Sequence, residues 1–86
     1  MALSERERSI IDFERTWWTF DGTKEELIND RLDCTPEAFA LELGALVDSP
    51  DALAHDPLVI RRLRRQRARA RRARSEASSA AHRKSR

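Results

Sequence analysis

Five helix-start signals divide the first 57 residues of this chain into short segments. Each signal has a Ser, Thr or Asp that can accept a hydrogen bond from the backbone of a helix beginning behind it. Two of them also have the spacing of a capping box, and the other three are followed by proline, which is favoured at the first helical position because its missing N–H would have no partner there. The signals are Ser4 with Glu7, Thr23 with Glu26, Thr35-Pro36, Ser49-Pro50 and Asp56-Pro57. No alternating β-branched segment competes with them, so the pattern predicts an all-α fold.

Apolar residues recur at helical spacing behind these signals and give each predicted helix one apolar face. We expect helices at about residues 5–19, 24–32 and 36–48, a single turn at 50–53 and a long helix from residue 57. The expected core consists of the first turns of that last helix together with Ile10, Phe13, Trp17, Leu27, Ile28, Leu32, Phe39, Leu43, Leu46 and Val47. The prediction is a small helical bundle with a helix-turn-helix-like core and a long basic C-terminal helix. Because Asp33 stands where such turns usually have glycine, two ordinarily packed helices are the alternative for the central pair.

Charge divides the chain into two unlike parts. The whole sequence contains 17 Lys and Arg against 15 Asp and Glu. Residues 1–56 contain 5 basic and 14 acidic side chains, whereas residues 57–86 contain 12 basic and one acidic. We therefore expect an acidic helical head at residues 1–60, an arginine-rich helical extension at 61–74 and a disordered tail at 75–86. Repulsion among the arginines predicts fraying of the extension beyond about Gln66 until anions neutralise it.

Several classes of protein do not fit this sequence. It has no apolar run of the roughly 20 residues that a membrane span requires, and its N-terminus lacks the pattern of a secretory signal, so we expect a cytoplasmic protein. Cys34, His55 and His82 do not have the spacing of a zinc site, and they offer no nucleophile with a base and an orienting group. We predict a protein that is not an enzyme and has no catalytic residues, metal or cofactor.

The segment from residue 61 to residue 74, RRLRRQRARARRAR, has nine arginines in fourteen positions. Arginines at this density surround a helix, so four to six of them can reach phosphates whichever face docks. The predicted slope of log affinity against log salt is roughly −4 to −5. The ligand would be nucleic acid, with DNA favoured over RNA, and not a membrane, because only alanine follows Leu63 as an apolar residue. The candidate nucleic-acid-binding residues are Arg61, Arg62, Arg64, Arg65, Arg67, Arg69, Arg71, Arg72 and Arg74.

The outer face of the third predicted helix lacks the side chains that read base pairs. It presents Glu37, Leu41 and Glu42 and has no Arg, Lys, Asn or Gln for bidentate contacts in the major groove. We therefore expect these three residues to contact a protein partner or a second copy of the chain. Trp18 lies next to the expected core residue Trp17; it would either close the rim of the core or remain exposed as an anchor for that partner.

Two stretches of the sequence resemble a known family. LSERERSIIDFERTWW at the start and PDALAHDPLVIRRLRRQR after the third predicted helix are similar to short actinobacterial proteins of unknown function, and the likeness covers about residues 3 to 74. The paired tryptophans and the Asp56-Pro57 start of a basic helix are its more specific elements. The resemblance implies a helix-turn-helix, an arginine-rich C-terminal helix and DNA binding. The acidic third helix departs from the family's pattern of aromatic and basic residues at that place.

These observations lead to a hypothesis of a nucleic-acid-associated protein acting in transcription or at the nucleoid. Its basic helix would bind phosphates and its acidic head would contact a protein. One alternative is an interaction adaptor whose basic helix binds an acidic protein surface or its own acidic head. A second alternative, which rests on the family resemblance, is a sequence-specific helix-turn-helix DNA binder.

Overall fold

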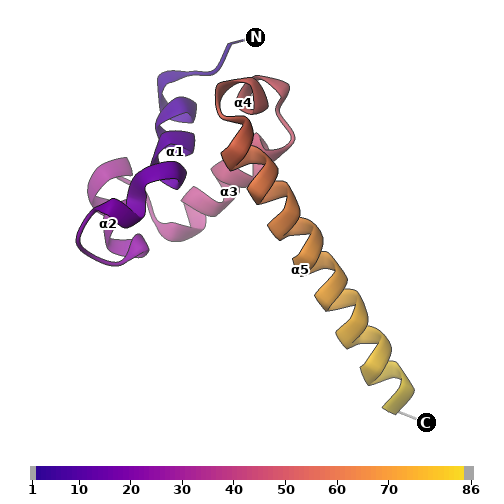
Figure 1. Ribbon diagram of the computed structural model, residues 1–86. Helices are drawn as coiled ribbons and strands as arrows, with labels where there is room; N and C mark the ends of the chain where they lie inside the picture. The colour runs from indigo at the N-terminus through magenta and orange to yellow at the C-terminus, as the bar shows by residue number, and fades with distance from the viewer. Residues whose placement is uncertain (1, 85–86) are drawn as a thin grey trace.

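Six helical segments make up the structure, a computed structural model that describes the backbone of residues 2–84 and the side chains of residues 2–77. In chain order they are α1 (Glu5–Thr16), the 3-10 turn η1 (Trp17–Thr19), α2 (Lys24–Leu32), α3 (Pro36–Val47), α4 (Pro50–His55) and α5 (Pro57–Lys84). Across this described range no strand is present, and the predicted small all-α bundle is confirmed. Figure 1 shows α1 to α4 gathered into a head from which α5 projects.

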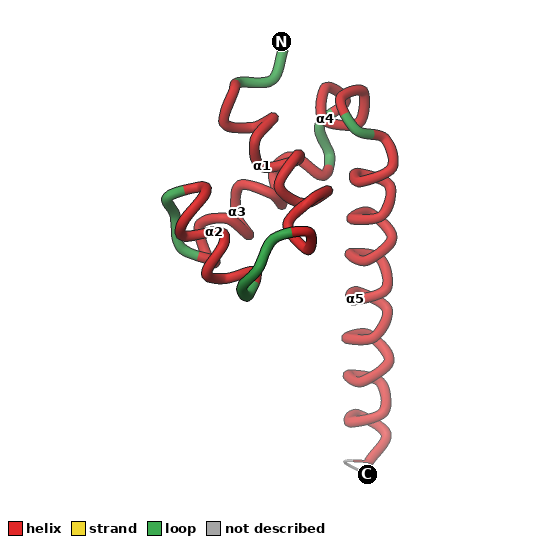
Figure 2. The backbone as a smooth tube through the Cα atoms, turned by 60° about the vertical axis from the view of Figure 1, so that its left-hand side comes forward, coloured by secondary structure: helices red, strands yellow, loops and turns green. Residues whose placement is uncertain are grey.

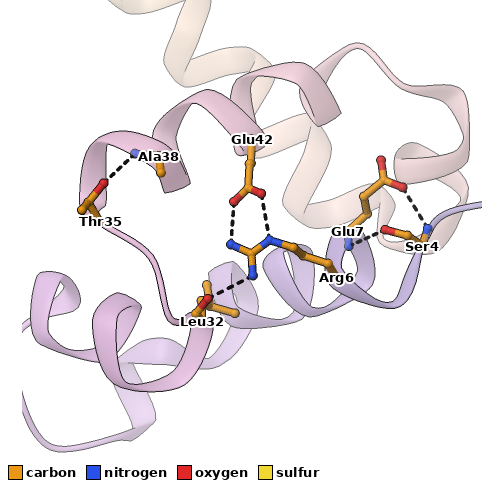
Figure 3. Close-up of polar contacts among 7 residues, drawn as sticks. All are labelled: Ser4, Arg6, Glu7, Leu32, Thr35, Ala38 and Glu42. Atoms are coloured by element: carbon orange, nitrogen blue, oxygen red, sulfur yellow. Dashed lines mark hydrogen bonds and ion pairs between the residues drawn. The ribbon is translucent and has the colours of Figure 1, made fainter.

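All five helix-start signals cap a helix. At Ser4 both bonds of the capping box form: the Glu7 amide donates to Ser4 Oγ at 3.1 Å, and the Ser4 amide donates to Glu7 Oε1 at 2.8 Å (Figure 3). Thr23 accepts from the amide of Glu26 at 3.1 Å, which is one of the two bonds expected there. At the start of α5, Oδ1 of the buried Asp56 accepts from the Val59 amide at 3.3 Å. The local signals therefore place the N-terminus of each of the five α-helices correctly.

The first helix ends earlier than its apolar pattern predicts. Its α-helical part stops at Thr16, whose hydroxyl donates back to the carbonyl of Asp12 at 2.9 Å, and the two tryptophans continue in the 3-10 turn. Such back-bonding by threonine is known to bend helices. Trp17, predicted in the core, is only partly buried and packs against the core from its edge, while Trp18 is 54% exposed. Of the two positions expected for Trp18, at the rim of the core or exposed, the structure shows the exposed one.

One hydrophobic core joins the head to the beginning of α5. Its largest fully enclosed side chains are Ile10 and Ile11 of α1 and Ile60 of α5. Leu43, predicted to be buried, packs against this core in a partly exposed position. Leu63 is 8% exposed and belongs to the core, so the expected boundary at residue 60 lies inside the packed region. The other buried apolar residues are Phe13, Leu27, Ile28, Leu32, Phe39, Leu46, Val47, Ala52 and Val59.

In the turn between α2 and α3, one residue, Asp33, has a left-handed backbone conformation. Asp33 ends α2 in the left-handed conformation, with φ 51° and ψ 48°, and α3 begins three residues later at Pro36 behind the capping side chain of Thr35. Aspartate is among the few residues that adopt this conformation without large strain. The residue that stands where glycine is usual therefore adopts a conformation that glycine adopts readily.

α5 continues much farther than expected. Residues 67–84, for which we expected fraying and then disorder, are helical and extend away from the head (Figure 2), and residues 85 and 86 lie outside the described part. The sequence offers a reason, because no Gly or Pro follows Pro57 and because alanine and arginine are both strong helix formers. The helix propensity of these residues thus outweighs the repulsion among the arginines, which was the reason to expect fraying.

Candidate nucleic-acid interface

The nine candidate arginines fall into two groups according to their position on α5. Three of them, Arg62, Arg64 and Arg67, are partly buried because they bond to the head. The remaining six are exposed, namely Arg61, Arg65, Arg69, Arg71, Arg72 and Arg74. The helix therefore divides one arginine-rich sequence into a set that holds α5 to the head and a set that faces solvent.

Arg62 participates in a buried ionic cluster. Its guanidinium donates to the carbonyl oxygen of Glu14 at 3.1 Å and lies 3.5 Å from Oε2 of the same residue. Glu14 is 4% exposed, and Lys24 of α2 pairs with its other carboxylate oxygen. The Lys24 ammonium also lies 5.4 Å from the centre of the Trp17 ring. Three helices thus meet at one carboxylate, and Arg62 is not free to bind a ligand unless this cluster opens.

Arg64 and Arg67 bind the C-terminal end of α3. Nε of Arg64 donates to the Val47 carbonyl at 2.8 Å, and Arg67 forms two bonds to the Asp48 carboxylate at 2.9 and 2.7 Å. Cations at this end satisfy carbonyl groups that have no partner within the helix and oppose its dipole. The hydrogen bonds from Arg67 hold the pKa of Asp48 below its ordinary value, and the charges of Arg64 and Arg71 act in the same direction. These contacts join α5 to the acidic head, and Arg67 is the last arginine with a described hydrogen bond to it.

Four of the exposed arginines form a continuous stripe on α5. Arg61, Arg65, Arg69 and Arg72 are spaced by four, four and three residues, which places them on one face of a helix. At about 1.5 Å per residue the stripe is roughly 16 Å long. Leu58, 77% exposed, precedes it by nearly one turn. We call these four residues the outer stripe.

The candidate partner residues on α3 are not equally available. Glu42 forms two bonds to Arg6 of α1, at 2.8 and 2.9 Å, and Arg6 also donates to the Leu32 carbonyl at 3.0 Å (Figure 3). The bonds from Arg6 lower the pKa of Glu42. Glu37 and Leu41 are exposed, Leu41 to 78%. Arg6 therefore joins α1 to α2 and α3, and Glu42, which binds it, is less available to a partner than Glu37 and Leu41.

Trp18, the fourth candidate partner residue, lies beside α5. Its ring packs edge-on against Trp17, with centroids 6.3 Å apart, and the Arg62 guanidinium lies 5.8 Å from its centre. Sequence reasoning named Trp18 and Arg62 for separate roles and did not place them together. It also missed Glu14, although a signal existed: Glu14 follows Ile10 by four residues, which puts a carboxylate on the apolar face of α1.

The described residues contain no group of three or more His, Cys, Asp or Glu that could hold a metal ion. Cys34 is a free, partly buried thiol that packs against the core, and Nε2 of His55 lies 2.9 Å from Oδ1 of Asp12. Of the helices in the described part, none is both long enough and apolar enough to cross a bilayer.

Comparisons with known proteins identify a family and nothing closer. Neither the curated proteins nor the solved structures that were searched contain a match. The family model that matches is described as "Protein of unknown function (DUF3263)", and it covers residues 2–75, which include the whole head and the nine arginines of α5. The chain therefore belongs to the DUF3263 family.

Proposed function

We propose that this protein is a nucleic-acid-associated factor without enzymatic activity, that α5 binds the phosphate backbone of DNA, and that it acts in transcription or at the nucleoid. One observation carries the proposal: six arginines are exposed within fourteen residues of one helix and form no ion pair among the described contacts. Long side chains with planar, permanently charged ends are well suited to phosphate. The three arginines bonded to the head hold this helix in place.

The number of exposed arginines sets the expected salt dependence. Each neutralised phosphate contributes about −0.9 to the slope of log affinity against log salt, so six contacts give roughly −5. Between 50 and 200 mM salt, a slope of −5 lowers the affinity by about 1,000-fold. A protein that binds an acidic protein surface through one or two ion pairs would show a much smaller slope.

The composition of α3 favours binding that does not depend on base sequence. Glu37 and Leu41 are exposed on α3, and Asp48 is exposed directly after it. None of the three can form the paired donor contacts that arginine, asparagine and glutamine make with guanine or adenine. The acidic head also repels phosphates, which favours a complex in which α5 faces the nucleic acid and the head faces away. We propose that the head, through Glu37 and Leu41, contacts a protein partner.

An adaptor function is the second candidate, and a specific contact favours it. Arg67 and Asp48 already form a two-bond pair between the basic helix and the acidic head, so the same pairing could join α5 to another acidic surface. Retention of a partner from the native cytosol after nuclease treatment would support the adaptor, whereas release of the captured material by nuclease would support the nucleic-acid function.

A salt titration of the full chain tests the proposal. We expect fluorescence anisotropy on a random-sequence DNA duplex to give a slope near −5, and replacement of all six exposed arginines by glutamine to abolish measurable binding. Glutamine keeps a high helix propensity, so circular dichroism of the variant should be unchanged. The matched control replaces the same six residues by lysine, which retains the charge and should retain most of the slope. Absence of binding by the unmodified chain at 50 mM salt would refute the proposal.

A further inference from the structure

The part of α5 beyond the head has a distribution of charge that restricts the shape of its ligand. Arg67 is the last residue with a described hydrogen bond to the head. The next ten residues, 68–77, form a helical segment that we call the distal segment, and Figures 1 and 2 show α5 extending into open space there. All its side chains are exposed.

The arginines of the distal segment point to opposite sides of the helix. Residues two positions apart in an α-helix are separated by about 200°, so Arg69 is nearly opposite Arg71, and Arg72 is nearly opposite Arg74. Arg69 and Arg72 belong to the outer stripe, whereas Arg71 and Arg74 form a second flank on the other side. The segment therefore has two charged arginines on each of two opposite flanks.

A flat ligand surface can use only one of these flanks. A membrane or an acidic patch on a protein would contact two of the four arginines and leave the other two in solvent. A groove with phosphates on both walls can contact all four. The major groove of B-form DNA, about 12 Å wide, admits an α-helix with a diameter of about 10–12 Å, whereas the major groove of A-form RNA is deep and narrow.

The other residues of the distal segment are mostly small, as suits a helix that lies in a groove. They are Ala68, Ala70, Ala73, Ser75 and Ala77, together with Glu76 near the end. Small side chains keep the helix thin and allow its backbone to approach the groove floor. The segment has no aromatic residue on which an unpaired base could stack, which disfavours single strands.

We infer that the distal segment lies in the major groove of duplex DNA, with Arg69 and Arg72 on the phosphates of one wall and Arg71 and Arg74 on those of the other. This inference rests on the proposed function and deepens it, because it names the form of the nucleic acid and the groove. No direct reading of bases is required, since all four contacts are to phosphates.

Two double variants of equal charge test the geometry. In the full chain, R69Q/R72Q removes one flank and R71Q/R74Q removes the other. Insertion into a groove predicts that each variant reduces the salt slope by about 1.8 and weakens binding at 0.1 M salt by about 60-fold. The corresponding lysine variants should restore the slope, and circular dichroism should report the same helix content in every variant.

A second experiment tests the groove itself. The probes are two DNA duplexes of the same sequence, one with cytosine and one with glucosylated 5-hydroxymethylcytosine, whose sugars fill the major groove and leave the phosphates in place. We expect at least a tenfold loss of affinity on the glucosylated duplex. The minor-groove ligand netropsin, added to the unmodified duplex, should leave the affinity unchanged.

The outcomes separate this inference from the function on which it rests. If only one double variant affects binding, or if glucosylation has no effect while netropsin competes, DNA binding stands and groove insertion is refuted. Tighter binding to duplex RNA or to a single strand of equal length would also refute it. If the unmodified chain binds no nucleic acid, the proposed function fails first.

Discussion

Replacing Asp48 with asparagine should strengthen binding to DNA by releasing one arginine. In the structure Arg67 donates two hydrogen bonds to this carboxylate, and these bonds lower the pKa of Asp48. Asparagine has nearly the same shape but no charge, so it can keep at most a weaker, neutral bond. We therefore expect Arg67 to become available to phosphates in Asp48→Asn and to raise the number of available cations on α5 from six to seven.

The expected size of the effect follows from counterion release. One additional phosphate contact makes the salt slope steeper by about 0.9. At 0.1 M salt this corresponds to an affinity up to about 8-fold higher, and the ratio of variant to unmodified affinity should be about 3.5 times larger at 50 mM than at 200 mM salt. Anisotropy on a random DNA duplex at four or five salt concentrations measures both quantities.

A control variant must distinguish the effect of a released arginine from the effect of a change in net charge. Glu37→Gln also removes one negative charge from α3, but it frees no described ion pair because Glu37 is exposed and has none. We expect Glu37→Gln to raise affinity slightly at low salt and to leave the slope unchanged. Equal slopes for the two variants would show that Arg67 does not reach phosphate and would refute the reasoning.

Three further predictions concern the stability of the head. Ile60→Ala, at a fully buried site, should lower the free energy of unfolding in urea by about 2–5 kcal/mol. The control Leu58→Ala, at a site 77% exposed, should change it by less than about 0.5 kcal/mol. Equal losses of stability in the two variants would contradict the packing described. The pKa of Glu42 is lowered in the folded state from its ordinary value of 4.5 by its arginine partner, so its contribution to stability is present above pH 4.5 and is lost as the pH falls through the lowered value. Glu42→Gln should therefore flatten the decline of stability with acid in that window, and a decline with the same steepness would argue against the ion pair. Asp33→Gly should raise stability by about 0.5 kcal/mol because glycine adopts a positive φ freely. Asp30→Gly, the same change within α2, should lower stability by about 0.3 kcal/mol, the difference in helix propensity between the two residues. Thermal unfolding of both variants compares them.

The sequence determined where each α-helix begins. Ser4 and Asp56 act through bonds to amides only three residues away, so no knowledge of the rest of the fold is needed to recognise them. The same holds for the periodic apolar faces of α2 and α3. Helix ends were predicted less well, because the end of α1 depends on a threonine back-bond and the length of α5 depends on a balance between helix propensity and charge repulsion.

The tertiary structure decided which of nine similar arginines are available. Arg62, Arg64 and Arg67 are chemically the same as their neighbours, and only the docking of α5 against α1 and α3 brings them to Glu14, Val47 and Asp48. No local pattern encodes these pairings, because the partners are 17 to 48 residues apart in the chain. The sequence by itself thus specified an acidic helical head and a basic helix, since composition and spacing are local properties. Which cations hold the two together and which face solvent is a consequence of packing alone.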